Sequence, residues 1–153
     1  MTIVRFRIIH IRMDNHDSLR LAPALEHATH ALGLWVERTF RDVVLTQAEA
    51  HVLAYLARHP NAAINDLHTS FGHKRSTLTS ILDRLEAHGW VRRRPHPTSR
   101  RLVAVELTEA GWAIGERVSG ALHTIEERIR ATVGGATIDD FLAVIHALEE
   151  ELQ

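Results

Sequence analysis

Apolar side chains recur every three or four residues along most of this chain, which is the spacing of one face of an α-helix. Between residues 17 and 41, for example, Leu21, Leu25 and Leu32 lie on one such face. The same spacing predicts further helices over residues 46–59, 64–71, 74–88, 108–133 and 137–152. The chain is therefore expected to be mostly α-helical.

Residues at the ends of these stretches are of the types that start and stop helices. Thr46-Gln-Ala-Glu49 has the spacing of a capping box, in which the first hydroxyl and the last carboxylate each accept a backbone hydrogen bond. Gly72 and Gly89 suit turns after two of the helices, because glycine adopts the left-handed backbone without steric cost. Thr108 is placed to cap the next helix, and Gly134-Gly135 is expected to break the chain before the last one, which Thr137 begins.

The stretch after Gly89 changes from helical to strand-like spacing. Pro95 and Pro97 bound the tip of an arginine-rich hairpin, whose return strand carries Leu102, Val103, Val105 and Leu107. Two helices joined by a turn and followed by such a hairpin predict a winged helix-turn-helix within a mostly α (α+β) fold. A helix is about 10–12 Å across and fits the roughly 12 Å major groove of B-DNA, so DNA binding is the first function to consider.

We expect four segments along the chain. Residues 1–16 form a leader, which is either unstructured or contains a short strand; residues 46–107 form the winged helix-turn-helix. Residues 17–45 and 108–153 form long amphipathic helices on either side of it. The simplest partner for their apolar stripes is the same stripes of a second copy, which predicts a homodimer. The alternative is that these helices fold back on their own chain.

Charge is distributed unevenly, although the formal net charge is only −1. Residues 1–70 carry equal numbers of acidic and basic side chains. Residues 71–101 carry eight basic and two acidic side chains, a net charge of +6, and residues 102–153 carry three basic and ten acidic ones, a net charge of −7. A local basic block of this kind is the electrostatic footprint expected of a nucleic-acid interface.

Three stretches of the sequence resemble the MarR family of dimeric winged-helix transcription regulators, over residues 17–152. They are LTQAEAHVLAYLARH, the run LHTSFGHKRSTLTSILDRLEAHGWVRRR, and RRLVAVELTEAG. The resemblance implies a cytoplasmic homodimer that binds a pseudo-palindromic operator in double-stranded DNA. It also implies repression that a small ligand relieves.

The resemblance places the family's recognition helix at residues 74–87 and the arginine of its wing at Arg101. The residues expected to contact DNA, from the resemblance and the basic block together, are Lys74, Arg75, Ser76, Thr77, Thr79, Ser80, Arg84, Arg94, Arg100 and Arg101. Two positions depart from the family pattern. Ser99 stands where an aspartate usually orients the wing arginine, and His73 stands in the turn where an aliphatic residue is usual.

Regulators of this type often bind small aromatic or phenolic acids, and four residues are candidates for such a pocket: Trp35, His51, Tyr55 and Trp112. Ordinary packing is the alternative for each of them. The twelve histidines raise a second alternative, a metal-responsive regulator of the same fold. His27 and His30 are three residues apart on one helix and close enough to share a metal. No metal signature such as His-Glu-x-x-His is present, so neither a metal nor another cofactor is expected.

Other classes of protein fit the sequence less well. No cysteine is present, which excludes disulfides and thiolate zinc sites. The sequence lacks a glycine-rich phosphate loop and a Gly-x-Ser-x-Gly elbow, so we do not expect an enzyme. Apolar runs are far shorter than the roughly 20 residues that cross a bilayer, so no membrane association is expected and the cytoplasm is the default location. A winged helix used only for protein contacts remains an alternative, but it would not need the basic block.

Overall fold

The computed structural model describes residues 21–152, except for the side chain of Arg100. The chain divides into two compact units, Met1–Val44 and Leu45–Gln153. The expected leader, residues 1–16, lies outside the described residues, as do residues 17–20 of the first expected helix. In the first unit, α1 (Leu21–Thr39) confirms that helix over its described part. The rings of Trp35 and Phe40 meet edge to face in this unit, with centroids 6.3 Å apart.

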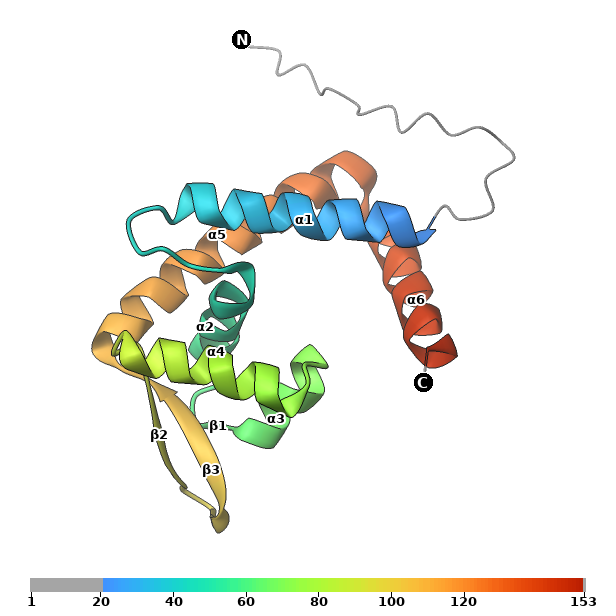
Figure 1. The fold of residues 1–153 in the computed structure, drawn as a ribbon. Coiled ribbons are helices and arrows are strands. Elements are labelled where there is room, and N and C mark those ends of the chain that lie inside the picture. Colours follow the sequence, from blue (N-terminus) through green and yellow to red (C-terminus); the bar gives the residue numbers. More distant parts are fainter. Residues whose placement is uncertain (1–20, 153) are drawn as a thin grey trace. The chain divides into compact units, whose positions relative to one another are not determined.

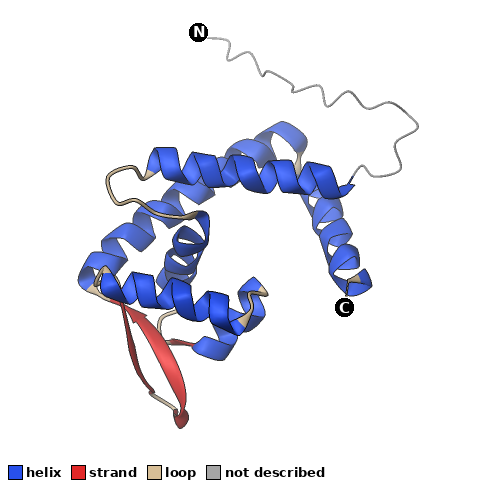
Figure 2. Cartoon of the chain, viewed as in Figure 1, coloured by secondary structure: helices blue, strands red, loops and turns tan. Residues whose placement is uncertain are grey.

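The second unit is a winged helix-turn-helix extended by two long helices (Figures 1 and 2). The predicted fold class, mostly helical with a hairpin wing, is confirmed. In chain order its elements are α2 (Gln47–Arg58), β1 (Ala62–Ala63), α3 (Ile64–Phe71), α4 (Arg75–Ala87), β2 (Val91–His96), β3 (Ser99–Leu107), α5 (Glu109–Val133) and α6 (Gly135–Glu151).

The predicted helix ends are found where the sequence placed them in α2, α3 and α4. The capping box of α2 is complete, because Thr46 Oγ1 accepts from the Glu49 amide at 3.3 Å and the Glu49 carboxylate accepts from the Thr46 amide at 3.0 Å. Gly72 ends α3 in the left-handed region, with φ of 60°. Gly89 follows α4 with φ of 72°, and hydrogen bonds from Gly89 to Glu86 and from Trp90 to Leu85 close a Schellman motif.

Two elements differ from the sequence-based prediction. The sheet has a third strand, β1, which pairs antiparallel with β3 and gives the order β1-β3-β2. Two alanines are too short a stretch to show any periodicity. The last helix begins at Gly135 rather than at Thr137, so the prediction that Thr137 starts it was wrong. The Thr137 hydroxyl instead donates to the carbonyl of Val133, the last residue of α5, at 2.8 Å, across the break at Gly134.

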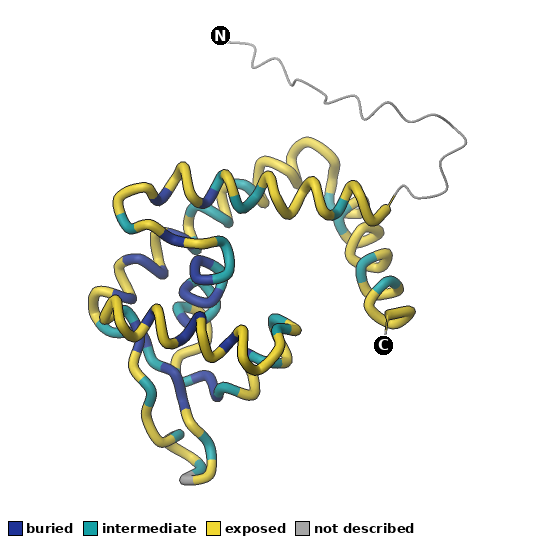
Figure 3. Tube along the Cα trace, in the orientation of Figure 1, coloured by how far each residue is buried: buried dark blue, intermediate teal, exposed yellow. Residues whose placement is uncertain are grey.

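The core of the second unit lies where α2, α4, α5 and the sheet pack together (Figure 3). Its fully buried side chains alternate with exposed ones at helical spacing, as the sequence predicts. They include Val52, Leu53 and Leu56 of α2, Leu67 of α3, Leu78, Ile81, Leu82 and Leu85 of α4, and Val118 of α5. Val105 of β3 is also fully buried. This packing buries one face of α4 and leaves the other exposed.

A second set of contacts fixes the wing between α4 and α5. Thr108 Oγ1 donates to the Gly89 carbonyl at 2.6 Å and accepts from the Gly111 amide at 3.0 Å, which confirms Thr108 as the cap of α5. The Thr108 amide also donates to the Trp90 carbonyl at 3.0 Å. Gly111 packs so closely on this carbonyl that an added Cβ would lie 1.8 Å from the oxygen. The end of α4, both ends of the wing and the start of α5 therefore meet at one point.

A cluster of aromatic rings joins α2 to the turn between α3 and α4. Tyr55 lies against His59 and Phe71, with centroid distances of 4.3 and 5.4 Å, and its phenol oxygen accepts from Ser70 at 3.1 Å. Phe71 in turn stacks on His73, at 6.1 Å. The histidine in the turn is thus accommodated by aromatic contacts.

We predict that Gly111→Ala destabilises the protein by about 3 kcal/mol, because the new methyl group overlaps a backbone carbonyl that cannot move alone. The matched control is Gly120→Ala in the same helix, where a Cβ meets nothing within 4 Å. There alanine should stabilise the helix by roughly 0.5–1 kcal/mol. Urea denaturation followed by circular dichroism measures both, and equal effects of the two substitutions would contradict the close packing at Gly111.

We also predict that the protein loses stability as the pH falls below about 6.5, in part through His51. Burial lowers the pKa of His51 below its ordinary value of 6.5, and the nearby His73 lowers it further. The unfolded chain therefore takes up a proton at a higher pH than the folded chain, so acid favours unfolding. Urea denaturation at pH 7.5 and 5.5 should show a smaller loss for His51→Gln than for the wild type. His123→Gln, which changes an exposed histidine of α5, should behave like the wild type.

Candidate nucleic-acid interface

The exposed face of α4 carries the polar residues that the sequence assigns to DNA contact. Leu78, Ile81 and Leu85 point into the core. Five residues of the first two turns of α4 are exposed: Arg75, Ser76, Thr77, Thr79 and Ser80. Thr79 Oγ1 donates to the Arg75 carbonyl at 2.9 Å, and Ser80 Oγ donates to the Ser76 carbonyl at 3.0 Å. Both hydroxyl oxygens retain lone pairs that face outward and accept hydrogen bonds.

The N-terminus of α4 carries cations in place of the acidic residues that usually stabilise a helix start. Lys74 is the N-cap residue and makes no side-chain cap hydrogen bond, and the first turn contains no acidic residue. A helix N-terminus already has a partial positive charge. Lys74 and Arg75 add to it, so this end of α4 is electrostatically suited to an anion such as a phosphate group.

The three consecutive arginines at the start of the wing are paired with acidic side chains. Arg92 Nε donates to Glu106 across the hairpin at 2.8 Å, and Arg94 Nε lies 3.5 Å from the same carboxylate. Arg93 points to the other side, where its guanidinium contacts Asp83 at 2.7 Å and also Glu86, both on α4. Arg93 therefore fixes the wing to α4. Arg94, which the sequence assigns to DNA contact, is about half exposed but shares a carboxylate.

Arg84 is also engaged within the protein. It lies on α4, and its Nε donates to Glu49 Oε1 of α2 at 2.6 Å. The Glu49 side chain is almost completely buried, whereas about half of the Arg84 side chain is exposed. Burial alone would raise the pKa of the Glu49 carboxyl, but hydrogen bonds from Arg84 and Thr46, together with the charge of Arg84, lower that pKa below its ordinary value.

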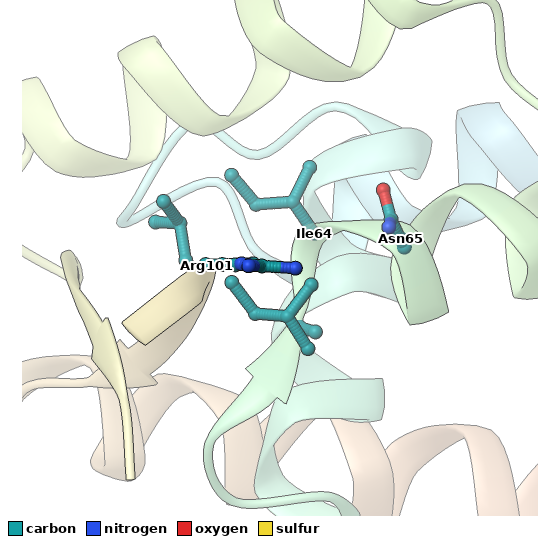
Figure 4. A pocket seen from close by; sticks show the side chains of 6 residues that line it. Ile64, Asn65 and Arg101 are labelled. Atoms are coloured by element: carbon teal, nitrogen blue, oxygen red, sulfur yellow. The ribbon is translucent and has the colours of Figure 1, made fainter. Parts of the chain in front are cut away.

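Arg101 leaves the hairpin at an irregularity of its strand. Pro95 pairs with Val103 and His96 with Ser99, so residues 100–102 have no counterparts on β2. Such bulges bend a strand and redirect its side chains. Figure 4 shows Arg101 extending from β3 toward the start of α3, where Ile64 and Asn65 lie. The side chain of Arg100, also assigned to DNA contact by the sequence, lies outside the described part of the structure.

Two surface grooves meet at Asn65, an exposed residue that sequence reasoning missed. One groove is lined by Asn65, Arg101 and neighbouring residues of β1, α3 and β3. The other is lined by Asn65, His68, Thr69 and Arg75. Asn65 thus lies between the wing arginine and the first arginine of α4. A single asparagine at a helix start carries no signal of this position in the sequence.

Three of the predicted contact residues form no ion pair with any described side chain. They are Lys74, Arg75 and Arg101. By contrast, Arg84, Arg92, Arg93 and Arg94 are all paired with carboxylates. The basic block of the sequence therefore corresponds to a smaller set of unpaired cations, at the start of α4 and on the bulge of β3.

The four residues proposed to line a ligand pocket are distributed over both units. His51 and Tyr55 lie on α2, one turn apart, and Trp112 lies in the first turn of α5 with about a third of its surface exposed. Trp35 belongs to the first unit. Tyr55 is already held by the aromatic cluster and by Ser70.

Within residues 21–152, no group of three or more histidine, aspartate or glutamate side chains is arranged to hold a metal ion. In the same range, no single helix has the length and apolar composition to cross a bilayer. α5 and α6 have that length and composition only when they are taken together, and the chain bends by 109° between them.

Comparisons with known proteins agree with this architecture. Residues 45–103 match the model of the MarR family. The chain is 38% identical to the HTH-type transcriptional regulator PecS of Dickeya dadantii over 90 residues, which cover 54% of this chain and about half (52%) of that relative. It is 30% identical to the homoprotocatechuate degradative operon repressor of Escherichia coli over 135 residues, 88% of either chain.

Among solved structures, the chain is similar to a MepR–DNA complex of Staphylococcus aureus, with a TM-score of 0.73 and 16% identity over 88% of this chain and 99% of that one. This likeness concerns the fold. The relatives named here are regulators of transcription and not enzymes. The family match, the long alignment with the repressor and the winged helix-turn-helix together show that the chain belongs to the MarR family of DNA-binding transcriptional regulators.

Proposed function

We propose that this protein is a homodimeric repressor that binds a pseudo-palindromic operator and is released from it by a small phenolic acid. The observation that carries the proposal is the unpaired positive charge at the start of α4, next to an exposed face of hydroxyl groups. In this role α4 is the recognition helix and lies in the major groove, with Thr77, Thr79 and Ser80 facing the bases. The protein would act in the cytoplasm, where the operator is.

The wing contributes a second contact in this proposal. Arg101, and Arg100 beside it, would reach the minor groove or the phosphate backbone next to the recognition helix. Asn65 shares one groove with Arg101 and the other with Arg75, so the three side chains would face the same stretch of DNA. Arg84 and Arg94, paired with carboxylates, would contribute less than the sequence suggests. The MepR–DNA complex, which has the same fold, supports this use of the fold.

Exposed apolar side chains on the last two helices support the dimer. Ile129 and Val133 near the end of α5, and Phe141, Leu142 and Val144 on α6, have 44–51% of their surface exposed. Several large apolar side chains left exposed on two successive helices favour an interface. A second copy that covers it would also give the two recognition helices the two-fold symmetry of a palindromic operator, with half-sites roughly 10 base pairs apart.

The nature of the ligand is suggested by one relative. The repressor with 88% coverage is named for an operon that degrades homoprotocatechuate, a phenolic acid. Within the second unit, the aromatic rings of Tyr55 and Trp112 are of the kind that stacks on a phenol, and His51 is suited to bond with a hydroxyl or carboxylate group. Trp35 of the first unit is a further aromatic candidate, considered by itself.

The proposed function is tested by titrating the protein onto its own upstream promoter fragment and onto a scrambled fragment, over a series of salt concentrations. The wild type should prefer the promoter and show a log–log salt slope near −8, for about eight to ten neutralised phosphates per dimer. Arg75→Ala and Arg101→Ala should each weaken binding more than about tenfold, since two charged contacts are lost per dimer. The salt slope should fall by about 2 in magnitude.

Arg92→Ala is the matched control, because this arginine is paired with Glu106 and should matter little for affinity. Unchanged affinity for Arg101→Ala would remove the wing from the interface. Absence of binding to both fragments at low salt would refute the proposed function.

Millimolar homoprotocatechuate added to the same titration should release the promoter fragment, and failure to do so would exclude this phenolic acid as the ligand.

The dimer is tested by Phe141→Glu, which places a charge in the apolar surface of α6. Analytical ultracentrifugation should find the wild type as a dimer and the variant largely as a monomer at micromolar concentration, because an unpaired buried charge is strongly unfavourable. Asp140→Asn, a change at the exposed neighbouring position, should leave the dimer intact. A dimeric Phe141→Glu variant would show that the two copies meet elsewhere.

A further inference from the structure

Glu49 is a charged residue in the core of the second unit, and every part of its carboxylate is used. Its side chain is 4% exposed. Oε2 accepts from the Thr46 amide at 3.0 Å and from the Thr46 hydroxyl at 2.8 Å, which completes the cap of α2. Oε1 accepts from Arg84 Nε of the recognition helix at 2.6 Å. One carboxylate therefore closes the start of α2 and binds α4 at the same time.

This contact differs in kind from the others that hold α4 on α2. The other side chains by which α4 faces the core, Leu78, Ile81, Leu82 and Leu85, are apolar, and apolar contacts have no preferred direction. A charge-assisted hydrogen bond is short and directional. It adds to the close packing of the core a directional restraint on rotation of α4 about its axis and on its sliding along α2.

The pair also behaves as a unit. A buried carboxylate without a partner is strongly unfavourable. Arg84 supplies the partner through its Nε, and half of the Arg84 side chain is exposed. Removal of Arg84 leaves the buried Glu49 carboxylate without its cation, whereas removal of the carboxylate leaves Arg84 half exposed to water.

We propose that Glu49 and Arg84 are positioning residues, which set the rotation and height of the recognition helix and thereby the specificity for the operator. The inference rests on the proposed function of α4. Contacts to base edges tolerate little displacement, whereas contacts to phosphates are less demanding and carry no sequence information. Loss of the pair therefore affects binding to the operator more than binding to unrelated DNA. Arg84 itself is not required to contact DNA.

The experiment compares Glu49→Gln, Arg84→Met and the double variant on promoter and scrambled fragments, over the salt series described above. Each single variant should lose about tenfold in affinity for the promoter, equivalent to about 1.4 kcal/mol. Affinity for scrambled DNA and the salt slope should stay near the wild-type values. The double variant should lose much less than the product of the two single losses, because both single changes break the same contact between α2 and α4. Arg58→Met, which removes an exposed arginine of α2 bonded to Ser119, is the control.

Three results would overturn the inference. If Arg84→Met lowers the salt slope by about 2 and weakens binding to both fragments equally, Arg84 contacts a phosphate directly. If the single variants are less stable to urea but keep the promoter preference of the wild type, the pair serves stability alone. If residual dipolar couplings of the free protein show α4 in the same orientation on α2 in Arg84→Met and wild type, the pair does not set the orientation.

The residual dipolar couplings need no DNA, so they test the role of Glu49 and Arg84 separately from the proposed function of the protein. A wild type that ignores the promoter fragment refutes the proposed function, while the couplings still decide whether Glu49 and Arg84 orient α4.

Discussion

The rest of this structure depends on one constraint: α4 packs against the core through one face only and leaves its other face exposed. Leu78, Ile81, Leu82 and Leu85 are fully buried, so the free energy that holds the helix comes from its inner side. Its outer side is then free to carry small polar groups that stabilise nothing within the protein. A helix that was apolar on both sides would be held more firmly but would have no surface left for a ligand as large as DNA.

Because apolar packing does not fix direction, the protein adds polar contacts at the edges of α4. Glu49 binds it from α2, and Arg93 of the wing binds Asp83 and Glu86 on its flank. At its end, the contacts of Gly89, Thr108 and Gly111 tie α4 to the wing and to α5. These contacts lie at the margins of the exposed face and leave its centre free.

The local features of this fold were predictable from the sequence, and the long-range ones were not. The capping box at Thr46, the left-handed turns at Gly72 and Gly89 and the cap at Thr108 depend on residues only a few positions apart. The pair of Glu49 and Arg84 joins residues 35 positions apart, and only the folded chain brings them together. For the same reason, the basic block did not reveal which of its arginines are neutralised. The bulge that redirects Arg101 and the groove position of Asn65 depend on the pairing of β2 with β3, which periodicity does not determine.

The way charge is paired explains how a chain with a net charge of −1 is suited to bind a polyanion. Interactions between exposed charges are largely screened beyond about 8 Å at physiological ionic strength. A phosphate near the start of α4 therefore interacts mainly with Lys74, Arg75 and the positive end of the helix, and hardly with the acidic residues of α6. Carboxylates that neutralise Arg84, Arg92 and Arg93 restrict the attractive surface further. The unpaired cations occupy a small part of the surface. DNA is therefore attracted strongly only in the orientation in which α4 and the wing both make contact, and weakly in any other.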